Sequence, residues 1–135
     1  MTPRNVKTTA VSKADYVIYR NKAKDFYEMA QQASDLDNWT GVGLNAVHCA
    51  ISSCDALLVF YIGVRSTSDD HMDAVDLLLR IPEISSGGEV STSKRIVAKK
   101  NLIAYECRDF RQSEALEILK LTKRFYRWTL TNLPK

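Results

Sequence analysis

The chain lacks the residue patterns that define several common classes of protein. Its three cysteines, Cys49, Cys54 and Cys107, are an odd number without a Cys-x-x-Cys pair, which fits neither a disulfide framework nor a zinc site. A His-Glu-x-x-His motif, a Gly-x-Ser-x-Gly motif and a glycine-rich phosphate loop are also absent. We therefore expect buried, reduced thiols, no bound metal and no other cofactor.

Long hydrophobic runs are absent as well. Residues 1–10 are polar and basic, unlike a signal peptide, and the longest apolar run, Ala56 to Val64, is too short to span a bilayer. The sequence therefore predicts a soluble, cytoplasmic protein that makes no contact with a membrane.

The residues that are present indicate one globular domain with an uneven charge. A chain of 135 residues with 45% hydrophobic content can bury one sizeable core. From Lys94 onward there are 11 Lys and Arg against 4 Asp and Glu, whereas the residues before Lys94 hold 8 against 12. This asymmetry suits an anionic partner such as RNA or an acidic protein, although solvated basic faces are also common.

Apolar residues recur at helical spacing along nearly the whole chain. The aromatic and alanine residues between Tyr16 and Ala30 predict an amphipathic helix over residues 11–34. A second helix is predicted from a cap at Asp37 or Asn38 to a glycine stop at Gly63. Because its second half is apolar on almost every side, we expect it to be the central helix.

Three further helices follow from local signals. Hydroxyl and acidic groups in residues 66–70 predict a helix start, and Pro82 a stop. Residues 84–93 contain Ser-Ser-Gly-Gly, which is typical of a flexible loop. We expect a fourth helix over residues 90–108 and a fifth that is capped by Ser113, with Glu114 in its first turn.

Together these elements predict an all-α fold, an up-down bundle of four to five helices without strands or internal repeats. Residues 1–10 are predicted to be a flexible N-terminal arm, and residues 11–135 a single helical domain.

The segment from Lys99 to Phe110 concentrates cationic, amide and phenolic groups between two helical patterns. Asn101 and Tyr105 are four residues apart and share a helix face, and the side chain of Lys100 flanks that face. The segment is a candidate phosphate site, in which the further cations are Arg95, Lys99 and Arg108. Each also has a structural interpretation, because lysines are often solvated and a tyrosine can close a helix interface with its hydroxyl bonded to backbone.

Other polar residues near these helices have similar alternatives. Arg95 is either a second phosphate cation or a salt-bridge partner for an acidic residue on a neighbouring helix. His48 lies close to the apolar stripe and has no second histidine at metal spacing, which favours a core or interface histidine. Asp55 either faces solvent or pairs with a cation such as Lys100 or Arg95.

Three stretches carry a family resemblance. They are Asn45–Val59 (NAVHCAISSCDALLV), Lys100–Phe110 (KNLIAYECRDF) and the closing Phe125–Leu130 (FYRWTL). Across residues 11–133 the chain resembles the HEPN superfamily. In that family the fourth helix carries an Arg, then a polar residue, and then a His after four to six intervening residues. Here Lys100, Asn101 and Tyr105 stand at those positions.

The resemblance implies a HEPN-like bundle and an association with RNA. Many members are metal-independent endoribonucleases, often toxins paired with a nucleotidyltransferase-like partner. They place two copies of the motif in a cleft at a homodimer interface. Other members are noncatalytic RNA-binding or interaction modules. By this resemblance Lys100, Asn101 and Tyr105 are the candidate catalytic residues, and a homodimer, RNA and a nucleotidyltransferase-like protein are the expected partners in a toxin–antitoxin or defence system.

The replaced residues weaken the expected catalysis more than phosphate binding. RNA cleavage without a metal needs a base for the 2′-hydroxyl and a cation for the phosphorane. A lysine keeps the charge of arginine but loses its bidentate fork. A tyrosine hydroxyl has an unperturbed pKa of about 10, so only about one in a thousand is ionised at neutral pH. Two function classes therefore remain, an RNA-directed protein with a degenerate ribonuclease motif and a noncatalytic protein-interaction subunit.

Overall fold

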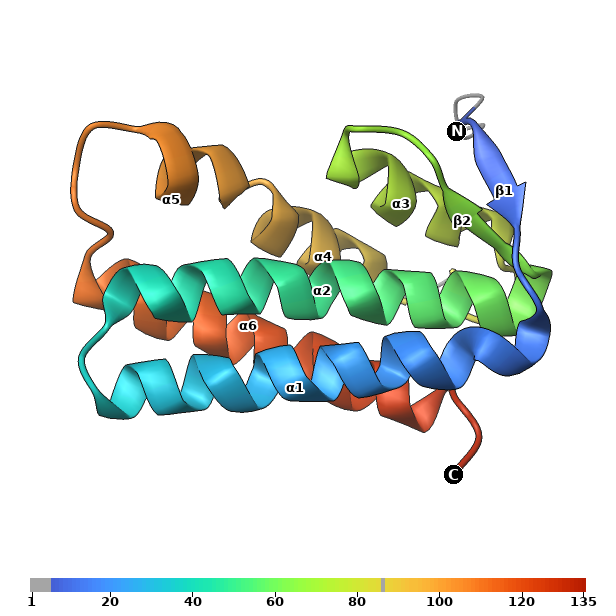
Figure 1. The fold of residues 1–135 in the computed structure, drawn as a ribbon, viewed down its shortest axis with the longest axis horizontal. Helices are drawn as coiled ribbons and strands as arrows, with labels where there is room; N and C mark the ends of the chain where they lie inside the picture. Colours follow the sequence, from blue (N-terminus) through green and yellow to red (C-terminus); the bar gives the residue numbers. More distant parts are fainter. Residues whose placement is uncertain (1–5, 86) are drawn as a thin grey trace.

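The computed structural model describes residues 6–85 and 87–135 and shows a bundle of helices (Figure 1). Three long helices, α1 (Tyr16–Asp35), α2 (Trp39–Ile62) and α6 (Gln112–Thr131), lie along one another. A one-turn 3-10 helix, Lys13–Asp15, precedes α1. Helix α2 returns antiparallel to α1, and α6 runs in the same direction as α2. The predicted all-α helical bundle is confirmed.

Helix α2 is the central helix because its residues are small or apolar on nearly every side. Leu57, Leu58 and Val59 are all fully buried. The side-chain oxygen of Asn38 accepts a hydrogen bond from the backbone N–H of Gly41 at 3.0 Å, which caps the first turn. Gly63 ends the helix in the left-handed conformation, with φ of 65°. Both predicted ends of this helix are confirmed.

The length of α2 changes the conclusion, drawn from the longest apolar run alone, that no segment is long enough to span a bilayer. By length and composition α2 is long and apolar enough to cross a membrane, although no uninterrupted apolar run of that length exists. Of its most apolar stretch, 78% is buried inside the bundle. That burial is typical of a core helix.

Short helices cover the side of α2 opposite α1 (Figure 1). They are α3 (His71–Leu77), which continues into a 3-10 turn over Leu78–Arg80, then α4 (Glu89–Val97) and α5 (Lys100–Tyr105). The continuous helix predicted over residues 90–108 is therefore wrong. The backbone N–H of Lys99 bonds the carbonyl of Ile96 at 3.1 Å, a tighter i−3 bond that separates α4 from α5.

Two predictions about helix and loop boundaries also need correction. Helix α6 starts one residue before Ser113, and its N-cap is Arg111, whereas Glu114 lies in the first turn as predicted. Within the loop predicted over residues 84–93, residues from Glu89 onward are helical, and Ser86 lies outside the described residues.

A small sheet joins the start of the chain to the end of α2. Strand β1 (Thr8–Ala10) pairs antiparallel with β2 (Val64–Ser66), with Thr9 opposite Arg65. The prediction of no strands is therefore wrong, and residues 8–10 of the predicted N-terminal arm form β1. Residues 1–5 of that arm lie outside the described residues. Val6, just before β1, is buried in the core.

The cysteine prediction holds for two of the three thiols. Cys49 and Cys54 are free and buried in α2. Cys107 is free but exposed, because it lies in the irregular segment between α5 and α6. Trp39 and Trp128 are partly buried against the core.

Candidate functional site

A close approach of α5 to α2 positions the segment predicted to bind phosphate. A Cβ atom at Gly43 would lie 2.8 Å from Cδ1 of Ile103 and 2.8 Å from Cε2 of Phe110. Both neighbours are buried. Glycine at this point of α2 therefore allows α5 and the chain that follows it to pack directly on the helix. This contact holds the start of α5, with Lys100 and Asn101, beside α3.

Lys100 and Asn101 line a groove of about 300 Å³ between α5 and the start of α3. The polar residues on the opposite wall are Asp69, Asp70 and His71. We call this hollow the His71 groove. Lys100 is half-buried. The structure therefore brings two of the three candidate catalytic residues together with an imidazole.

Tyr105, the third candidate catalytic residue, does not line the His71 groove. It is the last residue of α5, and its exposed fraction is 75%. The alternative that it closes a helix interface is wrong, because a side chain this exposed is not packed between helices. Sharing a helix face with Asn101 is therefore not sufficient to bring Tyr105 into the groove.

His71 is a site residue that the sequence analysis did not identify. It is the first residue of α3, directly after Asp70, whose carboxylate accepts a hydrogen bond from the Met72 backbone N–H at 2.9 Å. Burial lowers the pKa of His71 below its ordinary value, and the charges of Lys100 and His48 lower it further. The carboxylate of Asp70 opposes that change. Neutral imidazole is therefore favoured at neutral pH.

His48 is the second imidazole near Lys100. It is exposed on α2, so of the two predicted roles, core or interface histidine, the core role is wrong. One face of its ring stacks on Phe26, with the ring centroids 5.2 Å apart. This shielding lowers the pKa of His48, and the positive charge of Lys100 lowers it further. Sequence spacing could not relate His48 to His71, because they lie on different helices, α2 and α3.

A smaller hollow of about 90 Å³ adjoins the His71 groove, and Asp70 and His71 line both. Asp55 and Arg65 form its inner wall, with Arg65 Nη2 3.5 Å from Asp55 Oδ2. Asp55 is only 5% exposed, so the solvent alternative is wrong. The predicted pair with a cation is confirmed, but the cation is Arg65 and not Lys100 or Arg95. Burial raises the pKa of Asp55 to about 6, since desolvation outweighs the attraction of Arg65.

Two of the predicted phosphate cations lie in a different hollow. Arg95 and Lys99 line a groove of about 480 Å³ between α4 and α6. Arg95 Nη2 lies 3.6 Å from Glu117 Oε1, and both side chains are largely exposed. The salt-bridge alternative for Arg95 is therefore confirmed. The i−3 bond at Lys99 separates the two lysines, so that Lys99 and Lys100 line different grooves.

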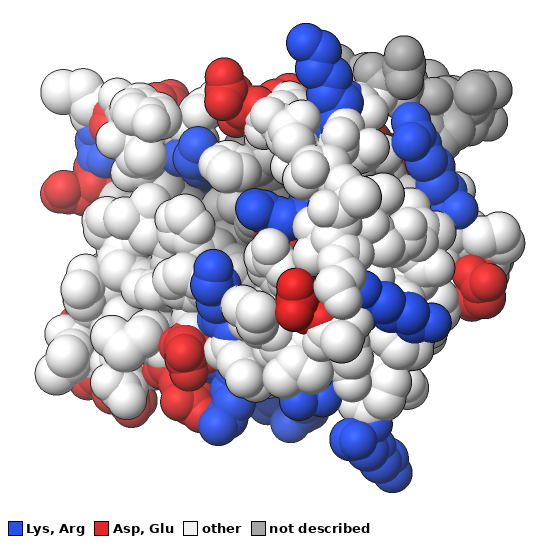
Figure 2. Space-filling model, turned by 45° about the vertical axis from the view of Figure 1, so that its right-hand side comes forward, with Lys and Arg blue, Asp and Glu red and all other residues white. Residues whose placement is uncertain are grey.

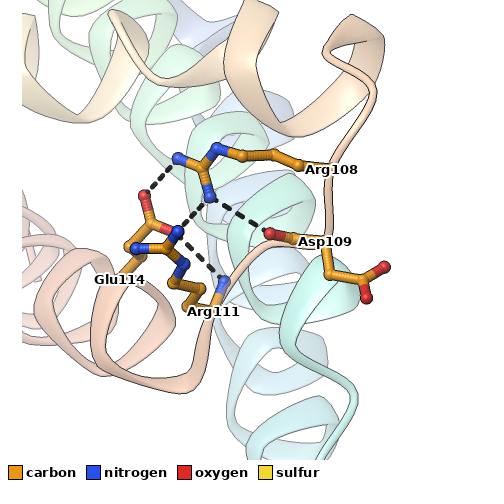
Figure 3. Close-up of polar contacts among 4 residues, drawn as sticks. All are labelled: Arg108, Asp109, Arg111 and Glu114. Carbon is orange, nitrogen blue, oxygen red and sulfur yellow. Dashed lines mark hydrogen bonds and ion pairs between the residues drawn. The ribbon is translucent and has the colours of Figure 1, made fainter.

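Arg108 is engaged in a bidentate ion pair (Figure 3). Its Nη1 and Nη2 atoms donate to the two carboxylate oxygens of Glu114 at 2.8 Å each, and Nη1 also donates to the Asp109 carbonyl at 3.1 Å. The Arg111 backbone N–H donates to Glu114 at 3.1 Å. The hydrogen bonds from Arg108 and then from Arg111 lower the pKa of Glu114 to about 2. Arg108 therefore joins the segment after α5 to the first turn of α6.

Charge on the visible face of the molecule is mixed. In Figure 2 the Lys and Arg side chains are separated by uncharged surface and by acidic groups. The excess of cations after Lys94 thus does not form one continuous patch on this face. Among residues 6–85 and 87–135, no three His, Cys, Asp or Glu side chains gather as metal ligands.

No protein-family model, curated protein or solved structure matches this chain.

Proposed function

We propose that this chain is a HEPN-like, RNA-associated protein that binds the RNA backbone in the His71 groove, in the cytoplasm and in a toxin–antitoxin or defence context. The proposal rests on one observation, that Lys100, Asn101 and His71 line the same hollow. An ammonium, an amide and an imidazole together supply a charge and several hydrogen-bond donors for phosphate oxygens.

The mixed charge of the groove argues against a long duplex as ligand. Asp69 and Asp70 lie opposite Lys100, so the groove is not uniformly cationic, whereas a continuous duplex would need a broad basic surface. A single phosphodiester would bind on the Lys100 side, away from the two carboxylates. A flexible single strand can present one phosphate at a time to such a groove.

The test measures binding of fluorescent single-stranded RNA by anisotropy, in excess chelator and over a range of salt concentrations. Loss of one phosphate contact should reduce the slope of log affinity against log salt by about 0.7. We therefore expect Lys100→Ala to bind RNA more weakly and with a shallower salt dependence than the wild-type protein. Lys120→Ala, which removes an exposed lysine of α6 outside the groove, is the matched control. Equal effects of the two substitutions would contradict the proposal.

A specific observation also favours a second function, a noncatalytic interaction subunit that pairs with a nucleotidyltransferase-like protein. Tyr105 is an exposed aromatic residue at the end of α5. Exposed tyrosines are enriched in protein interfaces. In this alternative RNA affinity is absent, and Tyr105→Ala weakens co-purification with such a partner while Lys100→Ala does not.

A further inference from the structure

A further groove, of about 540 Å³, lies between the first half of α1 and the end of α6. It is at the end of the bundle away from α5 (Figure 1). Helix α1 contributes Arg20, Asn21 and Lys24 to it, and α6 contributes Tyr126 and Leu130. We call this hollow the Arg20 groove. Its size is within the range of about 300–1,000 Å³ that is typical of ligand sites.

The Arg20 groove is cationic, unlike the other hollows described above. Asp or Glu side chains line the His71 groove, the smaller hollow beside it and the groove between α4 and α6. No acidic residue is among the described residues that line the Arg20 groove, and its cations are Arg20, Lys24 and Lys135. An acidic ligand would therefore meet attractive charge on both sides of this groove.

The partners of Arg20 leave its charge available to a ligand. Its Nη1 donates to the Pro134 carbonyl at 3.3 Å, and its Cζ lies 5.5 Å from the ring centroid of Tyr16. Both of these partners are neutral. Lys24 Nζ lies 3.6 Å from Glu28 Oε1, but both side chains are more than half exposed. Such an exposed ion pair is weak, so a carboxylate of a ligand can compete for Lys24.

The floor of the Arg20 groove is apolar and held in place. Leu130 is 38% exposed and Pro134 is also exposed, so both present apolar surface to the groove that they line. The segment after α6 is fixed to the bundle, because the Tyr61 hydroxyl donates to the Asn132 carbonyl at 2.7 Å and Leu133 is buried. A ligand that covers this floor therefore buries apolar surface without having to order the segment.

The side chains of the groove favour a peptide over a nucleic acid. The bases of single-stranded RNA bind proteins by stacking on accessible aromatic rings. Tyr126 is only 8% exposed, and its ring is stacked on that of Tyr27 with the centroids 4.8 Å apart. Asn21, in contrast, is exposed, and its amide can donate to and accept from a peptide unit.

We propose that the Arg20 groove binds an acidic peptide segment of a partner protein. Carboxylates of the segment pair with Arg20 and Lys24, and its aliphatic side chains cover the apolar floor. Lys100, Asn101 and Tyr105 contribute nothing to this surface. The inference therefore does not rest on RNA binding in the His71 groove.

The test measures binding of a short fluorescein-labelled peptide that alternates glutamate and leucine, by anisotropy over a range of salt concentrations. The same peptide with glutamine in place of glutamate is the matched probe. We expect wild-type protein to bind the acidic peptide more tightly than the neutral one. Added salt should reduce the difference, because salt screens exposed charges.

Substitutions in the groove identify the site. Arg20→Gln combined with Lys24→Gln should weaken binding of the acidic peptide about tenfold at low salt. Leu130→Ala should weaken binding of both peptides about threefold, because it removes apolar contact area. Lys22→Gln combined with Lys120→Gln is the matched control, since it removes the same charge outside the groove. Its affinity for each peptide should stay within about twofold of wild type.

Several outcomes would overturn the proposal. They are failure of the acidic peptide to bind, equal binding of the two peptides, and equal effects of the two double substitutions. Because the two peptides are compared on wild-type protein, that comparison decides the question even if a variant does not fold.

RNA binding by the same proteins separates this inference from the proposed function. Lys100→Ala should weaken RNA binding and leave peptide binding unchanged, whereas Arg20→Gln with Lys24→Gln should bind RNA like the matched control. Loss of RNA affinity confined to the groove variant would assign the Arg20 groove to nucleic acid and overturn the peptide proposal. Absence of RNA binding by wild-type protein would overturn the proposed function alone.

Discussion

Burial decides the chemistry of individual residues that the sequence presents as equivalent. Cys49 is buried, and this raises the pKa of its thiol to about 12, while burial raises the pKa of Cys54 well above its ordinary value. Cys107 is exposed between α5 and α6. The reactive form of a cysteine is the thiolate, so exposure and pKa together set the rate of modification.

We predict that an aromatic disulfide reagent modifies one thiol per folded chain quickly and the other two only on unfolding. Cys107→Ser should remove the fast phase, and Cys49→Ser should leave it unchanged, as measured by release of the coloured thiol. Rapid modification of two thiols per wild-type chain would contradict the burial of Cys49 and Cys54 in α2.

Asp55 is a second residue whose behaviour depends on its surroundings. Its pKa is raised from 3.8 to about 6, so between these values the folded state binds more protons than the unfolded state. The stability that this group contributes is therefore present at low pH and is lost as the pH rises through 6. The pair with Arg65 limits this loss without removing it.

We predict that Asp55→Asn becomes more favourable relative to wild type as the pH rises from 4 to 7. The difference in free energy of unfolding should change by up to about 3 kcal/mol, the equivalent of the pKa shift. Urea unfolding of both proteins at several pH values measures it. Parallel stability profiles would show that Asp55 titrates normally.

At the scale of elements, the contact between α2 and α5 determines where the candidate site forms. Gly43 permits this contact, because any side chain there would collide with Ile103 and Phe110. The i−3 bond at Lys99 then ends α4 and starts α5 at Lys100. The position of Lys100 beside His71 thus depends on one glycine and one tight turn.

We predict that Gly43→Ala destabilises the fold and weakens RNA binding, because α5 must move away from α2. Overpacking should lower the free energy of unfolding by about 1–3 kcal/mol, and the better helix propensity of alanine should offset about 1 kcal/mol of that loss. Gly88→Ala is the control, since a Cβ at Gly88 would meet nothing within 4 Å. Thermal unfolding and RNA anisotropy measure both effects, and equal stability of the two variants would argue against the close contact.

At the scale of the whole molecule, the candidate cations are divided between separate grooves. The cations Arg95 and Lys99 line one groove and Lys100 another, so a single chain does not gather them at one site. The family resemblance implies that two copies of the motif meet at a dimer interface. Tyr105, exposed at the end of the motif helix, is a suitable contact for a second copy.

We predict that light scattering at micromolar concentration gives twice the mass of one chain, and that Tyr105→Glu shifts the protein towards the monomer. A charge at a buried interface is costly, which is the reason for the shift. Leu36→Glu is the control, because Leu36 is also strongly exposed but lies between α1 and α2. A monomeric wild-type mass would remove the composite cleft.

The sequence by itself determined the features that local chemistry controls. The 3.6-residue period marks α1 and α2, and the Asn38 side chain and the left-handed Gly63 mark the two ends of α2. Glu114 appears in the first turn of α6 because its carboxylate accepts a nearby backbone N–H. The family resemblance also identified Lys100 and Asn101, whose spacing is local to one helix.

Only the tertiary structure decided the features that depend on distant residues. Strand β1 exists because β2, far along the chain, offers it backbone partners, and three-residue strands carry little periodic signal. Asp55 pairs with Arg65 because the sheet brings β2 beside α2. His71 and Lys100 line the same groove because α3 and α5 converge, and no spacing along the chain encodes that convergence, since packing of side chains between elements sets it.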